Sequence, residues 1–201
     1  MNYYQEIITQ KSWQILLEIK KKFDFVLIGG WAVWLYTKAL KSKDVDILVG
    51  YDVFEVLKKE LAVVKNERLK KYEAKIEEVD IDIYLPYYSN PGLPGEFIQK
   101  HLTTKEGFQV PKPEILLILK QRVYGQRKGS VKGEKDKLDI FGLLTLDLDF
   151  AFYKKVLKEN NQEQLVSELR NLLTTTKRIK ELDLKNHQLA KLREKIFSGL
   201  G

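Results

Sequence analysis

Hydrophobic residues follow two different periodicities along the chain, and the change falls near residue 110. In the front half, short apolar or alternating runs end on glycine or turn residues, which is typical of strands. The expected strands are residues 23–28, 44–49 and 72–85, the last with a turn near Glu77. Residues 12–22, 31–40 and 53–60 have helical spacing, so one expected helix precedes each of these strands. The front half is therefore predicted to mix helices and strands.

Local sequence signals refine these elements. Ser12 is expected to be the N-cap of the first helix, and Asp52 and Glu55 have the spacing of a capping box. The proline and glycine content of residues 87–96 predicts a loop, and two short runs around residues 105–107 predict a small hairpin.

From Pro113 onward, the hydrophobic runs have helical spacing. Asp149 is expected to cap one of these helices. The amphipathic segments are residues 114–127, 134–144, 150–159, 163–173 and 187–197. We therefore predict an α/β domain over residues 1–110 and a helical C-terminal region over residues 111–201.

The composition restricts the chemistry. Cysteine is absent, and His101 and His187 lie far apart in the sequence, which excludes disulfides, thiolate nucleophiles and cysteine-based zinc sites. Any bound metal is thus expected to be a hard cation such as Mg²⁺, held by carboxylate oxygens. No apolar run approaches the roughly 20 residues of a membrane span, and residues 1–10 lack the pattern of a secretory signal. We expect a cytoplasmic protein with no membrane partner.

The net charge of +7 is unevenly distributed. Residues 1–99 contain 14 basic and 15 acidic side chains, residues 100–137 contain 10 and 4, and residues 151–201 contain 11 and 6. A basic back half suits a polyphosphate or nucleic-acid partner. Taken alone, the excess is better explained by a solvated lysine surface.

The residues that carry the chemistry are Gly29 and Gly30, followed by Asp44 and Asp46. A double glycine at the end of a strand lets backbone N–H groups approach phosphate oxygens, and the next helix directs its N-terminus to the same place. Asp44 and Asp46 are two residues apart on an expected strand, so both carboxylates face one side and can share divalent cations. Nucleotidyl transfer needs such a metal against the triphosphate, commonly with a second one.

A third carboxylate from a neighbouring strand normally completes such a site. Alternation along residues 79–85 places Asp80 and Asp82 on one face of a strand. Asp82 is the expected third metal ligand because it lies just before the strand ends, and Asp80 is the alternative. Each aspartate alone can be a solvated strand residue, and for residues 79–82 alone that is the better interpretation. The ordered combination predicts Mg²⁺ as the cofactor and an NTP as the co-substrate.

This order of motifs resembles the signature of the polymerase-beta-like nucleotidyltransferase superfamily over residues 23–85. The resemblance implies a nucleotidyltransferase fold, α/β or α+β in class, with a short mixed sheet flanked by helices and followed here by a helical C-terminal half. It makes residues 1–110 the catalytic domain. Trp31 stands where the relatives often carry smaller residues, and we expect it to narrow the nucleotide pocket.

The segments around Ser42 and Lys120 resemble, more narrowly, the AbiEii group of toxin-type nucleotidyltransferases, which have a helix lysine followed by a basic-Asp-x-x-Asp sequence, here Asp136 and Asp139. This resemblance implies nucleotide binding by Ser42 and Lys120 and catalytic roles for Lys120 and Asp136. Lys120 lies on an apolar helical stripe and needs a negative partner. The sequence leaves two partners open for the Lys120 ammonium, the nucleotide phosphates and the carboxylate of Asp136. Asp139 is expected to be structural.

The expected function is transfer of a nucleotidyl group from an NTP, such as ATP, to an RNA acceptor, for example a tRNA end. The AbiEii resemblance implies the toxin of a toxin–antitoxin pair, with a cognate antitoxin as partner. One alternative is a nucleotidyltransferase that modifies a hydroxyl of a small molecule or protein. The other is a non-catalytic nucleotide-binding module of the same fold. The intact glycines and carboxylates argue against that last alternative.

Overall fold

The computed structural model describes residues 3–179, 181–182 and 184–201. The chain divides into two compact units, Met1–Lys112 and Pro113–Gly201. The first unit is built on a mixed sheet flanked by helices, and the second is helical. The predicted α/β class is therefore confirmed.

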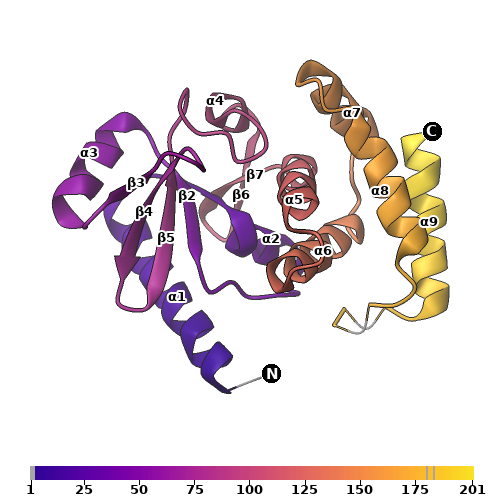
Figure 1. Ribbon diagram of the computed structural model, residues 1–201, viewed down its shortest axis with the longest axis horizontal. Helices are drawn as coiled ribbons and strands as arrows, with labels where there is room; N and C mark the ends of the chain where they lie inside the picture. Colours follow the sequence, from indigo (N-terminus) through magenta and orange to yellow (C-terminus); the bar gives the residue numbers. More distant parts are fainter. Residues whose placement is uncertain (1–2, 180, 183) are drawn as a thin grey trace. The chain divides into compact units, whose positions relative to one another are not determined.

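The sheet of the first unit has seven strands in the order β3-β4-β5-β2-β1-β7-β6, and β4, β5 and β2 are visible side by side in Figure 1. Two neighbouring pairs, β2 with β5 and β1 with β7, are parallel, and the other pairs are antiparallel. The strands are β1 (Val26–Ile28), β2 (Val45–Leu48), β3 (Val64–Asn66), β4 (Lys71–Ile76), β5 (Val79–Tyr84), β6 (Leu102–Lys105) and β7 (Phe108–Pro111).

The helices of this unit include the three predicted from the sequence and a short additional one. They are α1 (Tyr3–Lys22), α2 (Gly29–Thr37), α3 (Tyr51–Glu60) and α4 (Gly95–Ile98). The short α4 lies at the end of the segment expected to be a loop, and β3 was not expected from the sequence. The turn near Glu77 and the hairpin of β6 and β7 are confirmed.

Two expected caps are wrong. Helix α1 begins well before Ser12, because Ile8 continues the buried stripe of Ile15 and Ile19. Ser12 is instead buried, and its Oγ accepts a hydrogen bond of 2.8 Å from Nε1 of Trp31. Helix α3 is capped by Gly50, which places Asp52 inside its first turn.

The second unit consists of helices that bury leucine, isoleucine and aromatic side chains between them. They are α5 (Pro113–Arg127), α6 (Val131–Leu144), α7 (Phe150–Glu159), α8 (Gln164–Thr175) and α9 (Asn186–Leu200), of which α8 and α9 lie side by side (Figure 1). Asp149 caps α7 as predicted, accepting from the Phe152 N–H at 2.8 Å. None of the helices in the described residues is both long enough and apolar enough to cross a membrane.

Candidate active site

A glycine turn at the end of β1 meets the carboxylate of Asp46. Gly29 has a φ of 66°, a conformation that other residues rarely adopt. A Cβ atom built on Gly29 would lie 2.1 Å from Oδ2 of Asp46, so no side chain fits there. The register causes this approach, because Ile28 and Asp46 are partners across β1 and β2. The carboxylate therefore lies at the start of α2, where the helix dipole favours negative groups.

The register of the sheet also brings Asp82 to this place. Asp46 and Asp82 are Cα partners in the parallel pair of β2 and β5, so their side chains leave the same face of the sheet. Asp44 lies one residue before β2, close enough to Asp82 for its charge to act on that carboxyl. The structure therefore gathers the three predicted carboxylates around β2 and β5.

Asp80, the alternative third carboxylate, lies elsewhere on β5. It is the partner of Lys75 on β4, its carboxylate is 3.8 Å from Nζ of Lys75, and its side chain is 64% exposed. The register thus separates the two aspartates of β5. Asp82 adjoins Asp46, whereas Asp80 belongs to a solvated strand pair.

Lys71 on β4 is a site residue that the sequence analysis missed. Its Nζ is 2.5 Å from Oδ2 of Asp82 and 2.9 Å from Oε1 of Glu73, and its side chain is only 10% exposed. The alternation of Lys71, Glu73 and Lys75 places these residues on one face of β4. That pattern could have marked the face, but only the pairing of β4 with β5 shows which carboxylate Lys71 meets.

The electrostatics of Asp82 reflect two opposing effects. Burial raises the pKa of its carboxyl, and the hydrogen bond from Lys71 lowers it. The charges of Glu73 and Asp44 raise it again, so the pKa lies above the ordinary value. Burial lowers the pKa of the Lys71 ammonium, but its bonds to Asp82 and Glu73 outweigh that effect and raise it overall. Burial therefore makes the charged form of Asp82 unfavourable, and the ion pair with Lys71 offsets part of that cost.

The donor set around β2 fits a hard cation bound together with phosphates. Within the described part of the chain, no three carboxylate or imidazole groups form a ready-made metal site. Mg²⁺ is usually held by one or two carboxylates, the remaining positions going to water and substrate phosphates. Asp44 and Asp46 supply two carboxylates, and Asp46 lies against the glycine turn.

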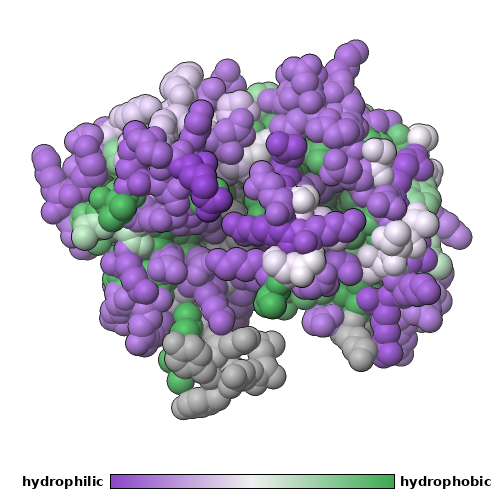
Figure 2. Space-filling model, viewed as in Figure 1, coloured by the Kyte–Doolittle hydropathy of each residue, from purple (hydrophilic) through white to green (hydrophobic). Residues whose placement is uncertain are grey.

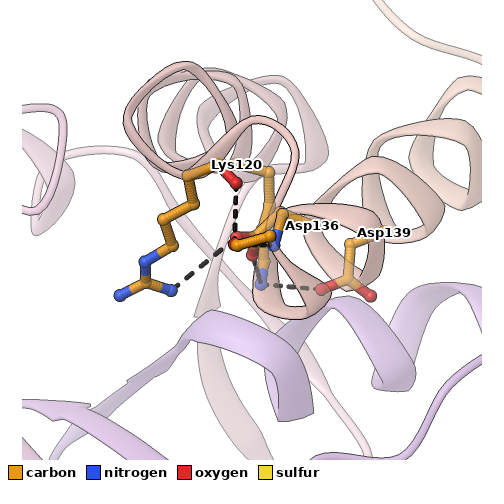
Figure 3. Close-up of polar contacts among 6 residues, drawn as sticks. Lys120, Asp136 and Asp139 are labelled. Atoms are coloured by element: carbon orange, nitrogen blue, oxygen red, sulfur yellow. Dashed lines mark hydrogen bonds and ion pairs between the residues drawn. The ribbon is translucent and has the colours of Figure 1, made fainter.

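Lys120 and Asp136 lie in the second unit, on α5 and α6, together with Asp139 (Figure 3). Nζ of Lys120 is 3.3 Å from Oδ1 of Asp136 and 2.6 Å from Oδ2 of Asp139. Arg127 adds a longer ion pair of 3.7 Å to Asp136. The ion pair between Lys120 and Asp136, one of the two interpretations from the sequence, is therefore present and extends to Asp139.

The remaining predicted residues are largely buried. Gly30 lies in the first turn of α2, and Ser42 is 3% exposed in the link before β2. Trp31 is 1% exposed and packs against α1, with its ring 4.9 Å from that of Trp13 and its N–H bonded to Ser12. Trp31 is thus a core residue packed on α1, and its expected effect on a nucleotide pocket stays a prediction.

Comparison with known proteins identifies the fold. No family model matches the sequence, and no curated protein matches it. An antigenic nucleotidyltransferase-like protein from Paracoccidioides brasiliensis matches in structure with a TM-score of 0.55 and 19% identity, over 93% of this chain and 92% of that one. JHP933 from Helicobacter pylori matches with a TM-score of 0.53 and 15% identity, over 98% and 93%. A candidate nucleotidyltransferase from H. pylori has the same TM-score and identity, over 100% and 97%. This chain therefore has the fold of nucleotidyltransferase-like proteins.

Proposed function

We propose that this chain is a Mg²⁺-dependent nucleotidyltransferase that moves a nucleotidyl group from an NTP to an acceptor hydroxyl. The supporting observation is the contact between the Gly29 turn and the Asp46 carboxylate, with Asp82 in register beside it. Carboxylates that lie close together repel one another, which makes it costly to bring Asp44, Asp46 and Asp82 to one place. A bound divalent cation would relieve that repulsion and would keep coordination positions for substrate phosphates.

The residues of this chain divide the work of the transfer. The backbone at Gly29 and Gly30 would approach the phosphates, and Asp44 and Asp46 would hold the metal. Bound Mg²⁺ supplies positive charge to the triphosphate oxygens. The acceptor oxygen forms a bond to the α-phosphorus, and the bond from that phosphorus to pyrophosphate breaks, with its electron pair leaving on pyrophosphate. The acceptor proton passes to solvent water. Asp82 lies beside Asp46 and orients the acceptor hydroxyl.

RNA is the acceptor that the charge distribution supports. The basic excess lies at residues 100–137 and 151–201, and hydrophilic residues cover most of the face shown in Figure 2. The basic excess suits an anionic acceptor such as a tRNA end, because binding would release counterions. The toxin role and the cognate antitoxin rest on the AbiEii-like motifs at Ser42, Lys120 and Asp136.

The test is incubation of the full chain with Mg²⁺, each α-labelled NTP and total RNA. We expect label on RNA from the wild type and none from an Asp44→Ala/Asp46→Ala variant. Asp80→Ala is the matched control, because it removes an exposed carboxylate from the same sheet face, and it should label RNA normally. Full activity of the double variant would overturn the proposal. Label on protein or a small molecule would replace RNA as the acceptor.

A further inference from the structure

Lys71 presents a cation to the carboxylate that adjoins the proposed metal ligands. Its Nζ lies 2.5 Å from Oδ2 of Asp82, the distance of a short charge-assisted hydrogen bond. Asp82 is in turn the Cα partner of Asp46. A lysine ammonium therefore already occupies an Asp82 oxygen, on the face of the sheet that Asp46 shares.

A second carboxylate on the same face of the sheet, that of Glu73, also holds this ammonium. Oε1 of Glu73 is 2.9 Å from Nζ of Lys71, and the same oxygen accepts a 2.9 Å hydrogen bond from Nδ2 of Asn66 on β3. Glu73 is also the Cα partner of Asp82. A chain of polar contacts thus runs across β3, β4 and β5. Because Lys71 is 8% exposed, its aliphatic chain is packed in place as well as its ammonium group.

We propose that Lys71 is a positioning residue that takes the place of a second divalent cation, so that the site binds one metal ion through Asp44 and Asp46. This inference rests on the proposed function. It departs from the expectation that Asp82 is a third metal ligand. Two cations compete for the Asp82 carboxylate, and the ammonium is covalently tethered beside it. The Asp82 carboxylate then stays available to the acceptor hydroxyl, and Lys71 fixes the orientation of that carboxylate.

The test counts Mn²⁺ bound to the full-length protein, by electron paramagnetic resonance, in the presence of a nonhydrolysable ATP analogue. We expect one Mn²⁺ per chain in the wild type at saturation and two in Lys71→Met, which keeps the stem but removes the charge. The double variant Lys71→Met/Asp82→Asn should return to one, because Asp82 is the ligand that Lys71 masks. A purely structural lysine would change stability and leave these numbers unchanged.

Lys75→Met is the matched control, since Lys75 lies on the same strand and pairs with Asp80 on the same partner strand. It should bind one Mn²⁺. Two Mn²⁺ in the wild type, or one in folded Lys71→Met, would overturn the proposal for Lys71 and leave the metal site of the proposed function intact. No bound Mn²⁺ in any variant would overturn both.

A second measurement applies if Lys71→Met does not fold. Asp82→Asn on its own keeps Lys71 and removes only the carboxylate charge that the ammonium pairs with. We expect it to bind one Mn²⁺ at saturation, as the wild type does, because Asp82 is not a ligand. If Asp82→Asn lost that ion while keeping a wild-type circular dichroism spectrum, Asp82 would be a metal ligand. That result would overturn the inference.

Discussion

Two largely buried lysines, Lys71 and Lys120, each pair with two carboxylates, in surroundings that differ. Lys71 joins Glu73 and Asp82 across β4 and β5, where the acidic side chains are 41% and 20% exposed. Lys120 joins Asp136 and Asp139 between α5 and α6, where the acidic side chains are 6% and 1% exposed. One lysine and two carboxylates form a half-open cluster in the first unit and a closed cluster in the second.

The difference shows that burial decides what such a cluster can do. The charges in the closed cluster are shielded from water, so each is stabilised mainly by its partners. Removing one charge leaves the others buried without a partner. In the half-open cluster, solvent still reaches Glu73 and Asp82, and a substrate or ion has the same access. We therefore expect the Lys120 cluster to contribute mainly to stability and the Lys71 cluster mainly to the site.

The largest expected effect is that of Lys120→Met. It leaves Asp136 and Asp139 buried without their ammonium, which should cost about 3–5 kcal/mol of the free energy of unfolding. Urea unfolding followed by far-UV circular dichroism measures the loss. The three tryptophans, Trp13 and two others on α2, lie in the first unit, so tryptophan fluorescence reports that unit separately.

Two further variants test whether burial is the cause. Lys137→Met removes an ion pair with an exposed glutamate on α6 and should change stability by about 0.5 kcal/mol or less. Lys120→Met combined with Asp136→Asn and Asp139→Asn removes the buried charges that have lost their partner. This triple variant should regain part of the lost free energy of unfolding. A triple variant no more stable than Lys120→Met alone would argue against stranded charge as the reason.

The next largest effect is that of Lys71→Met on stability. We expect a loss of about 1–3 kcal/mol, because two charge-assisted hydrogen bonds are lost while solvent partly compensates the carboxylates. Lys75→Met, with both side chains of its ion pair exposed, should lose about 0.5 kcal/mol or less. The measurement is urea unfolding followed by tryptophan fluorescence. If Lys71→Met cost as much as Lys120→Met, the comparison between the two clusters would fail.

The sequence predicted the carboxylates of the candidate site better than it predicted their partners. Asp44 and Asp46 stand out because their spacing and the preceding glycines are local features of the chain. Asp82 could be separated from Asp80 only by the register of β5 against β2, which depends on residues far apart in the sequence. Lys71 was missed for the same reason, since its partner lies on another strand.

The fold shows the same division between local and long-range information. The cap at Asp149 was predicted because its partner is three residues away. Ser12 was predicted as a cap because the expected helix began there, yet its partner is Trp31 on another helix. Strand β3 has two of its three residues exposed, so it lacks the hydrophobic alternation that marks a strand.

Alkaline pH should affect the core around Lys120 through Tyr153. Burial raises the pKa of the Tyr153 phenol well above its usual value. The neutral phenol donates a hydrogen bond of 2.7 Å to Oε1 of Gln121, next to Lys120 on α5. The neutral phenol therefore stabilises the fold fully below about pH 10, and this contribution is lost as the pH rises above that value.

Tyr153→Phe isolates this effect. Near neutral pH it should cost about 1 kcal/mol, because Gln121 loses a buried hydrogen bond. Above pH 10 that difference should shrink by up to about 1.4 kcal/mol per pH unit, because only the wild type has the phenol to ionise. Urea unfolding of both proteins from pH 7 to pH 11 measures the difference. A difference that grows with pH would contradict the assigned direction.

The smallest expected effect is that of salt, and it separates the two clusters most directly. Raising the ionic strength from about 0.1 to 1 M shortens the Debye length from about 10 to 3 Å, but screening acts only where ions and water have access. The cost of Lys71→Met should therefore fall by about 0.3 kcal/mol, while that of Lys120→Met stays constant. Urea unfolding at both ionic strengths measures this, because urea is uncharged. An equal fall for both lysines would show that solvent reaches both clusters alike, and burial would then no longer explain why one is assigned to the site and the other to the core.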